Sequence, residues 1–222
     1  MPPDAPAAAT ALEVLYADDA LLVLDKPAGL LCVPGRGADK QDCLSARAQA
    51  RFTDALVVHR LDMATSGLVL MARGTEAQRQ LNRAFIAHDV AKRYVAVVDG
   101  QPQPNTTPWS LIDLPIAADW PRRPLRVIDA QAGKPSRTRW RVAPAPADIA
   151  GATRLELEPL TGRTHQLRVH LQAIGHSILG DALYGTPEAQ AKAARLLLHA
   201  TQLDLAHPVS GQALQFHSPV PF

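Results

Sequence analysis

The sequence predicts one α+β domain, and three observations support this prediction. The chain has 222 residues, of which 47% are hydrophobic and 20% charged, a balance typical of a globular protein long enough to bury a core. Patterns typical of strands and of helices are both present, without an internal repeat. No long linker divides the chain, so we expect one domain over residues 13–222 after a disordered, Pro/Ala-rich tail at residues 1–12.

The first half of the chain contains two strand patterns, each followed by a helix pattern. Residues 21–24 form a strand-like apolar run, and dense turn signals separate it from a helix predicted over about residues 42–52. Residues 68–71 are typical of a buried strand. In the helix predicted after it, Thr75 and Gln78 have the spacing of a capping box.

The middle of the chain predicts three further strands. Residues 94–98 are short and β-branched, and residues 155–160 have a similar character. Between them, apolar or hydroxylated residues alternate with arginines, which predicts a strand that buries one side and exposes three arginines on the other. The arginines are Arg137, Arg139 and Arg141.

The last third contains one ambiguous segment and two clearer ones. Residues 164–174 alternate as a strand does, but their apolar positions also share one helix face, and Gly175, a typical helix stop, favours the helix. Thr186 followed by Pro187 predicts the start of another helix, and residues 196–198 the start of a strand. The 19 prolines indicate many turns and loops.

Composition also argues against several classes of protein. No apolar run approaches the roughly 18 residues of a membrane span, and the first ten residues lack the basic and apolar regions of a signal peptide. The two cysteines, Cys32 and Cys43, have neither metal-ligand nor CxxC spacing, and no pair of histidines has metal spacing. We therefore expect a cytoplasmic protein with free thiols and without a bound metal.

Basic residues are concentrated in one window of the chain. Residues 122–141 contain seven basic residues against the single acid Asp129, although the formal charge of the whole chain is only +2. Such clustering is typical of a surface that binds a polyanion, and a solvated loop and strand is an equally good interpretation. The basic residues are Arg122, Arg123, Arg126, Lys134, Arg137, Arg139 and Arg141.

Polar side chains interrupt two otherwise apolar segments, residues 59–67 and residues 162–168. A carboxylate that enters a buried strand needs a cation or hydrogen-bond donors, and Asp62 and Arg163 can supply such a pair. On the periodicity of the sequence alone, a purely structural salt bridge between Asp62 and Arg163 is the better interpretation. Motifs of nucleotide-driven and zinc-peptidase chemistry are missing from the sequence.

These two segments resemble signature motifs of the RluA family of pseudouridine synthases. Residues 59–67, HRLDMATSG, are similar to the family's HRLDxxTSG motif, and residues 162–168, GRTHQLR, to its GRTHQ(L/I)R motif. Three further segments resemble family sequences in family order, at residues 25–30, 92–96 and 180–185. The short N-terminus and residues 119–124, DWPRRP, are most similar to the member for which the family is named.

The resemblance implies the pseudouridine synthase fold, a mixed and mainly antiparallel sheet with helices and loops around a central cleft. It also implies an isomerase that converts uridine to pseudouridine in structured RNA without a cofactor. The expected partners are a transfer RNA anticodon stem-loop, a hairpin of 23S ribosomal RNA, or both, with no membrane and with a monomeric enzyme. We expect no S4-like domain, which many relatives carry before the catalytic domain.

The resemblance also assigns roles to single residues. Asp62 matches the catalytic aspartate, with Arg163 as its partner, and Tyr94 the active-site tyrosine. Leu167 packs in the pocket, and Thr65 belongs to the same site. The target base has to leave its stack, so Arg60 is our candidate to fill the gap, with His59 as an alternative that more simply orients the turn. Phosphates are assigned to the basic window, namely to Arg122, Arg123, Arg137 and Arg139.

Two other classes of function remain open from the residues. An RNA-binding module without chemistry is disfavoured, because Asp62, Tyr94 and Arg163 are all present. A carboxylate-dependent RNA hydrolase normally clusters acids around metal ions, and Asp62 has no acidic neighbour within seven residues.

Overall fold

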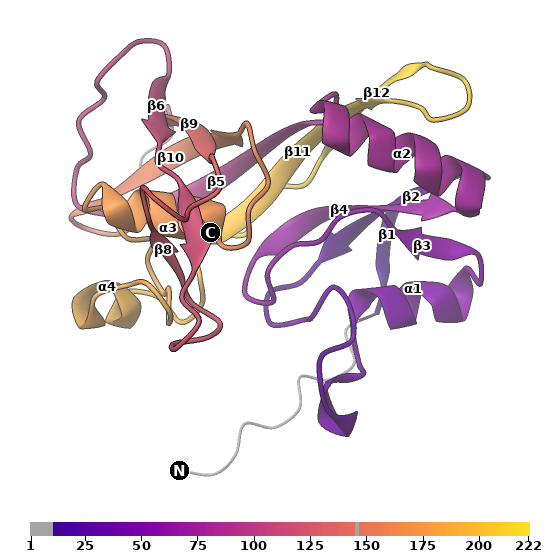
Figure 1. Cartoon of the computed structure of the whole chain (residues 1–222), viewed down its shortest axis with the longest axis horizontal. Coiled ribbons are helices and arrows are strands. Elements are labelled where there is room, and N and C mark those ends of the chain that lie inside the picture. The colour runs from indigo at the N-terminus through magenta and orange to yellow at the C-terminus, as the bar shows by residue number, and fades with distance from the viewer. Residues whose placement is uncertain (1–10, 145–146) are drawn as a thin grey trace.

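The computed structural model describes residues 11–144 and 147–222, and the predicted disordered tail therefore lies outside the described residues up to position 10. Leu12, which we placed in that tail, packs against a core cluster. The chain forms two lobes joined by long central strands (Figure 1).

Ten strands of the described residues form one mixed sheet, in which β1, β2, β4, β11, β5, β10, β9 and β6 follow one another. Strand β3 adds to β4, and β12 adds to β11. The strands are β1 (Glu13–Ala17), β2 (Leu21–Lys26), β3 (Ala55–Val57), β4 (Ser66–Arg73), β5 (Ala91–Asp99), β6 (Ser110–Asp113), β9 (Arg137–Val142), β10 (Ala152–Pro159), β11 (Leu198–Ala206) and β12 (Ala213–His217).

One pair of neighbours in the centre of this sheet is parallel. Strands β4 and β11 pair in parallel at Ser66–His199 and Gly67–Ala200, whereas the other named strand pairs in the described part of the chain are antiparallel. A Cβ atom added to Gly67 would lie 2.2 Å from the carbonyl oxygen of Ala200. Glycine is required there because the two backbones approach so closely.

Alternation along β2 covers both faces of the N-terminal half of the sheet. Leu21 and Val23 pack in the cluster that contains Leu81 of α2 (Thr75–Ala87). Leu22 and Leu24 pack on the opposite side, with α1 (Leu44–Arg51). Figure 1 shows α1 and α2 on opposite sides of the sheet. This half is therefore a sheet between two helices, preceded at α1 by a short 3-10 turn, Ala38–Lys40.

In the C-terminal half, α3 (Gln166–Ala173) packs beside β9 and β10. The helix prediction for residues 164–174 is confirmed, and Gly175 follows with the positive φ of 84° expected of a helix stop. Helix α4 (Pro187–Ala191) begins as predicted, because the Thr186 hydroxyl accepts a hydrogen bond from the Ala189 amide at 3.2 Å.

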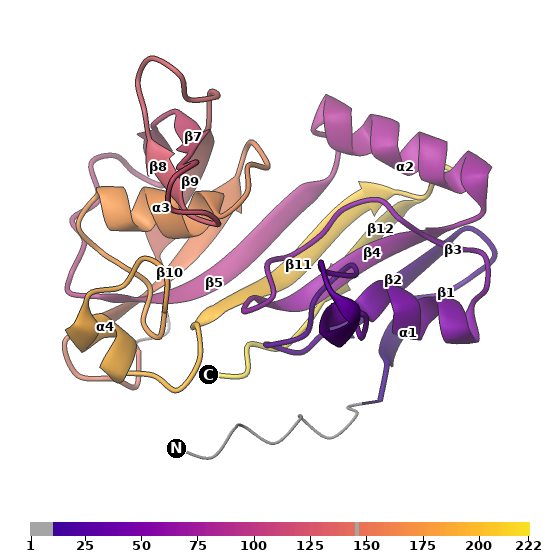
Figure 2. The ribbon, with the colours of Figure 1, turned by 60° about the horizontal axis from the view of Figure 1, so that its bottom comes forward.

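A separate two-stranded hairpin, β7 (Ile116–Ala118) and β8 (Arg126–Ile128), stands away from the main sheet beside α3 (Figure 2). This hairpin and the short strands β1, β3, β6 and β12 were not predicted. The strands and helices that the sequence predicts are all present, with shifted ends.

The predicted capping box is wrong. Gly74, with φ 76°, occupies the N-cap position of α2, so Thr75 is already the first helical residue. The Gln78 side chain donates instead to the Val57 carbonyl at 2.9 Å, which ties α2 to β3. The spacing of Thr75 and Gln78 matches a capping box, in which Thr75 would be the N-cap residue. The turn at Gly74 instead starts the helix one residue earlier, at Thr75.

Candidate active site

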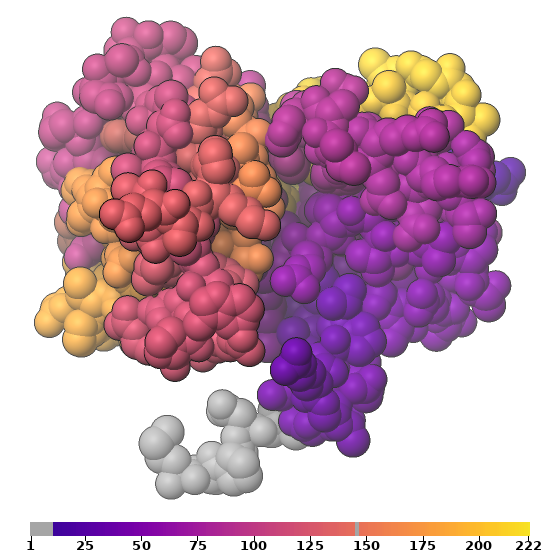
Figure 3. All heavy atoms as spheres, in the orientation of Figure 1, coloured from indigo at the N-terminus to yellow at the C-terminus, as the bar shows by residue number. Residues whose placement is uncertain are grey.

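A cleft of about 310 Å³ lies between the two lobes (Figure 3). It contains residues from both segments that the sequence singled out, although they are about a hundred positions apart. Its lining residues are His59, Arg60, Leu61, Asp62, Thr65, Phe85, Lys92, Tyr94, Pro159, Thr161, Gly162, Arg163, His165, Gln166, Leu167, Arg168 and Leu198.

Asp62 lies on the turn that enters β4, with its side chain 24% exposed to the cleft. The Thr65 amide donates to the Asp62 carbonyl at 3.1 Å and closes the turn. Thr65 itself is buried and lines the cleft.

Lys26 stabilises the turn that carries Asp62. Its fully buried ammonium donates to the carbonyls of Pro27 at 2.8 Å, Leu30 at 2.9 Å and Met63 at 3.0 Å. The Gly29 amide also donates to Met63 at 2.9 Å. Burial lowers the pKa of Lys26 to about 8. The segment at residues 25–30 therefore fixes the residue next to Asp62.

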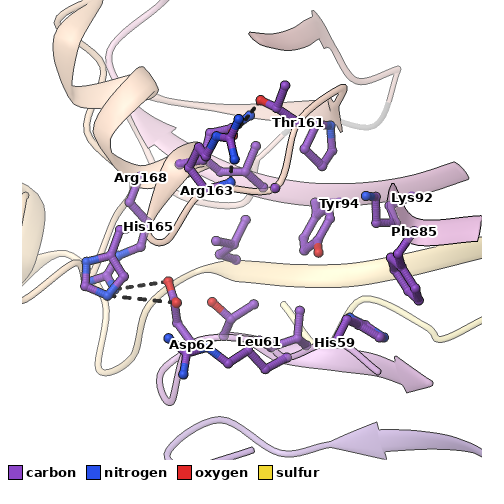
Figure 4. Close-up of a pocket in the computed structure, with 17 residues that line it drawn as sticks. His59, Leu61, Asp62, Phe85, Lys92, Tyr94, Thr161, Arg163, His165 and Arg168 are labelled. Atoms are coloured by element: carbon purple, nitrogen blue, oxygen red, sulfur yellow. Dashed lines mark hydrogen bonds and ion pairs between the residues drawn. The ribbon is translucent and has the colours of Figure 1, made fainter. Parts of the chain in front are cut away.

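Two side chains that approach the Asp62 carboxylate come from α3 and from the residue before it (Figure 4). Arg168 Nη1 lies 3.5 Å from Asp62 Oδ2, and His165 Nε2 lies 3.9 Å from Oδ1. The predicted pair of Asp62 with Arg163 is not formed, because Arg163 lies in the loop before α3 and its Nε donates to the Pro135 carbonyl at 3.3 Å. Arg163 still lines the cleft wall.

Arg168 is held by a second, fully buried carboxylate. Asp181, which is 0% exposed, contacts Arg168 through two hydrogen bonds, Nε to Oδ2 at 2.8 Å and Nη2 to Oδ1 at 2.6 Å. Asp181 Oδ1 also accepts from the amides of Leu183 and Tyr184. The Arg168 guanidinium therefore has a fixed orientation, with its Nη1 facing Asp62.

His165 is fixed in the same way by a neighbour of Asp181. Its Nδ1 forms a hydrogen bond of 2.7 Å with the Tyr184 hydroxyl, which also accepts from the Arg126 amide. Burial is the main cause of a lowered His165 pKa, and the ring is neutral at neutral pH. His165 has a φ of 58°, a strained conformation for a residue other than glycine. This strain is local to the residue that faces Asp62.

Gln166 connects the loop before α3 to the sheet. Its side-chain oxygen accepts from the Thr161 hydroxyl at 2.7 Å and from the Arg163 amide at 3.0 Å. Its amide nitrogen donates to the Arg137 carbonyl and to the Thr138 hydroxyl. The buried side-chain amide of Gln166 therefore links the loop that forms this wall of the cleft to strand β9.

The apolar surface of the cleft comes from Leu167 and Tyr94. Leu167 is buried and lines the cleft. Tyr94, on β5, points its hydroxyl toward the turn that carries Leu61 and Asp62 (Figure 4). Burial, with a smaller effect of Asp62, raises the Tyr94 pKa well above its usual range, so the ring is a neutral phenol at neutral pH.

His59 and Arg60 have different surroundings. His59 Nε2 accepts from the Leu70 amide at 2.9 Å, the ring stacks on Phe85 at 4.7 Å, and burial lowers its pKa to about 3. It is a neutral residue that fixes the turn. Arg60 is exposed, and within residues 11–144 and 147–222 its guanidinium has no hydrogen-bond or ion-pair partner. Of the two, Arg60 is the side chain that is available to RNA.

The strand arginines of the basic window lie away from the cleft. Thr138 and Trp140 pack with α3, so Arg137, Arg139 and Arg141 point to the other face of β9. Glu158 pairs with Arg139 at 3.4 Å, and Glu156 pairs with Arg141 at 2.6 Å. The predicted strand, with one side buried and three arginines on the other, is confirmed, but acids of the neighbouring strand pair with two of these arginines.

Sequence reasoning missed four functional-site candidates: His165, Arg168, Asp181 and Lys92, which also lines the cleft. His165 and Arg168 lie in a motif that was singled out, and Asp181 lies in a segment that was noted. In the described part of the chain no cluster of three or more potential metal ligands occurs. No helix in that part is long and apolar enough to cross a membrane.

Comparisons with known proteins agree on one family. The model of the family described as RNA pseudouridylate synthase matches residues 20–173. The dual-specificity RNA pseudouridine synthase RluA of Escherichia coli strain K12 is 46% identical over 211 residues, which cover 95% of this chain and 94% of that protein. RluA of Vibrio parahaemolyticus serotype O3:K6 is 44% identical over 200 residues, covering 89% of this chain and 79% of that protein.

The fold has a solved counterpart of the same description. Human RNA pseudouridylate synthase domain containing 1 superposes with a TM-score of 0.79 and 28% identity, over 99% of this chain and 87% of that one. A second human protein of this type, domain containing 4, has a TM-score of 0.72 and 25% identity, over 94% of this chain and 88% of that one.

Proposed function

The chain belongs to the RNA pseudouridylate synthase family, and from this premise we propose that Asp62 is the catalytic group that isomerises a uridine bound in the cleft. The enzyme is an RNA pseudouridine synthase. We propose a transfer RNA anticodon stem-loop, a hairpin of 23S ribosomal RNA, or both, as its substrates. The similar E. coli protein is named a dual-specificity enzyme, and this name supports the proposal of two kinds of RNA substrate.

One observation carries the catalytic assignment: the Asp62 carboxylate faces the cleft opposite a fixed guanidinium, that of Arg168. Isomerisation breaks the bond between uracil N1 and the ribose and forms a new bond to uracil C5. An ionised carboxylate can attack covalently or stabilise positive charge on the ribose without first losing a proton. Arg168 faces that carboxylate at 3.5 Å and can orient it, so it takes the role that we expected of Arg163.

The other cleft residues suit a flipped uridine. Tyr94 presents a neutral phenol ring on which uracil can stack, and Leu167 completes the apolar surface. Arg60, exposed two residues before Asp62, is proposed to fill the space that the base leaves. Thr65 contributes to the binding surface, and His59 supports the turn.

The RNA backbone needs cations, and Arg122 and Arg123, in the turn between β7 and β8, remain our candidates to bind its phosphates. Arg163 lines the cleft wall and joins them as a third. Arg137 and Arg139 can contact only RNA that reaches the other face of β9, because their side chains point away from α3. No cofactor is needed for the isomerisation, and we expect the enzyme to act as a monomer.

Asp62→Asn tests the assignment, because the amide keeps the shape of the side chain but removes its charge. Tritium release from uracil C5 should fall more than about 10³-fold, while affinity for a stem-loop RNA stays nearly unchanged. Asp42→Asn is the control, since Asp42 forms an exposed pair with Arg47 at 2.6 Å outside the cleft. Near-wild-type release from Asp62→Asn would show that another group does the chemistry.

A further inference from the structure

The turn between β7 and β8 exposes a tryptophan that the catalytic cleft does not use. Trp120 is 67% exposed, although large aromatic side chains are usually buried. The Arg123 guanidinium lies 3.8 Å from the centre of its ring. An indole and a guanidinium stacked in this way form a flat, cationic surface, and such surfaces stack well on nucleobases.

This stacked pair is held by a turn with its own hydrogen bonds. Asp119 accepts from the Arg122 amide at 3.3 Å and from Arg122 Nε at 2.7 Å. The Asp119 amide donates to the Leu125 carbonyl, and the Leu125 amide donates back to Arg122. Because the turn is already ordered, a ligand that binds there does not have to offset the entropy of ordering it.

The turn is also connected to the active site. The Arg126 amide donates to the Tyr184 hydroxyl at 2.9 Å, and the same hydroxyl holds His165 beside Asp62. Figure 2 shows the β7–β8 hairpin next to α3, from which Arg168 projects. The hairpin that carries Trp120 is therefore tied through Tyr184 to His165 of the cleft.

A groove of about 650 Å³ runs beside Trp120 and shares Gly162 and Arg163 with the catalytic cleft. Its walls carry the cations Arg126, Lys134 and Arg163. The acid in this wall, Asp129, uses its Oδ1 to accept from the amides of Gln131 and Ala132. The groove thus combines one aromatic platform with several cations, which is the composition of a site for single-stranded nucleic acid.

We propose that this groove binds the nucleotide next to the target uridine, with its base stacked on the Trp120–Arg123 surface. Its phosphates contact Arg126, Lys134 and Arg163. This inference rests on the proposed function, because the uridine in the cleft determines which nucleotide reaches the groove. Stacking accepts every base, so the groove selects RNA in which the neighbouring base is unpaired and can leave the stack.

Trp120→Ala should weaken binding of a stem-loop RNA about 5- to 150-fold. Stacking is not a phosphate contact, so the salt dependence of binding should stay the same, whereas Lys134→Gln should lower its slope by about 0.7–1. Trp120→Phe should recover much of the affinity. Val209→Ala, at another exposed apolar residue, is the control and should bind as wild type does.

Abasic RNAs identify the stacked nucleotide. Stem-loops that lack the base on the 5′ or the 3′ side of the uridine are titrated with wild-type protein and with Trp120→Ala. At one of these positions, removing the base from the RNA and Trp120 from the protein should together cost no more affinity than either change alone. Additive losses at both positions, or wild-type affinity in Trp120→Ala, would overturn the proposal, as would the absence of measurable binding by the wild type.

Turnover separates this proposal from the one on which it rests. Binding titrations need no chemistry, so non-additive losses without any pseudouridine would support the groove and refute the catalytic assignment. If pseudouridine formation depends on Asp62 but the binding losses are additive, the catalytic assignment stands and the groove proposal is refuted.

Discussion

Asp181→Asn tests whether the buried carboxylate positions Arg168 for the reaction. Asn is nearly isosteric and keeps an acceptor for the amides of Leu183 and Tyr184, so the main change is loss of the charge that pairs with Arg168. Breaking one side of a buried ion pair costs about 3–5 kcal/mol. For a chain of this size the melting temperature should fall by about 6–20 °C, at roughly 2–4 °C per kcal/mol.

Asp99→Asn is the matched control for this change. Asp99 pairs with Lys192 at 2.5 Å, but both side chains are about one-third exposed. Exposed pairs contribute about 0–1 kcal/mol, so the melting temperature should fall by no more than about 4 °C. Both variants are melted by circular dichroism and assayed for tritium release well below their transitions.

The kinetic result distinguishes positioning from stability. Because Arg168 loses its fixed orientation beside Asp62, kcat should fall on the order of 10²-fold in Asp181→Asn, with little change in KM. The control variant should keep wild-type kcat. Wild-type kcat in a folded but destabilised Asp181→Asn enzyme would refute the positioning role and leave the pair purely structural. Equal melting temperatures of the two variants would refute the assigned burial.

Two further predictions concern acid stability and metal dependence. Because the His59 pKa falls from 6.5 to about 3 on folding, the unfolded chain binds a proton that the folded chain does not, and stability should drop as pH falls from 6.5 toward 4. His59→Gln keeps an acceptor for Leu70 and should reduce this slope by up to about 1.4 kcal/mol per pH unit in urea titrations, and an unchanged slope would contradict the assignment. Turnover should survive EDTA and leave the mass of the RNA unchanged, with a carbodiimide adduct resistant to mild alkali at one uridine, and strand scission or free uracil would indicate a hydrolase.

The strands and helices were predictable wherever a local pattern was strong. Alternation and apolar runs predicted β2, β4, β5, β9 and β10, and the glycine at 175 resolved the ambiguity of α3. Short strands such as β6 and β7 depend on pairing with distant partners, and three or four residues contain too little pattern to reveal them. Helix α2 begins where Gly74 turns the chain, and the spacing of Thr75 and Gln78 does not predict this backbone turn.

The candidate site divides in a similar way. Asp62, Tyr94 and Leu167 could be proposed from the sequence because recognisable motifs contain them, and all three line the cleft. The choice between Arg163 and Arg168 depends on where α3 begins and on a buried acid 13 residues further along, Asp181. The charge of the arginine strand likewise depends on Glu156 and Glu158, which belong to the partner strand. A linear window cannot contain such information, because it arises only from pairing in three dimensions.

The parallel contact between β4 and β11 has a consequence for when the enzyme first becomes active. It joins Ser66 to His199, whose side chains also share a hydrogen bond across 133 positions of sequence. Asp62 precedes β4, whereas the strand that separates β4 from β5, which carries Tyr94, is β11, and β11 is made after both. A chain still emerging from the ribosome therefore contains Asp62 before the strand that joins it to Tyr94 has been made. Pairing across so long a loop costs entropy, so we expect the cleft to be complete only after β11 has joined the sheet.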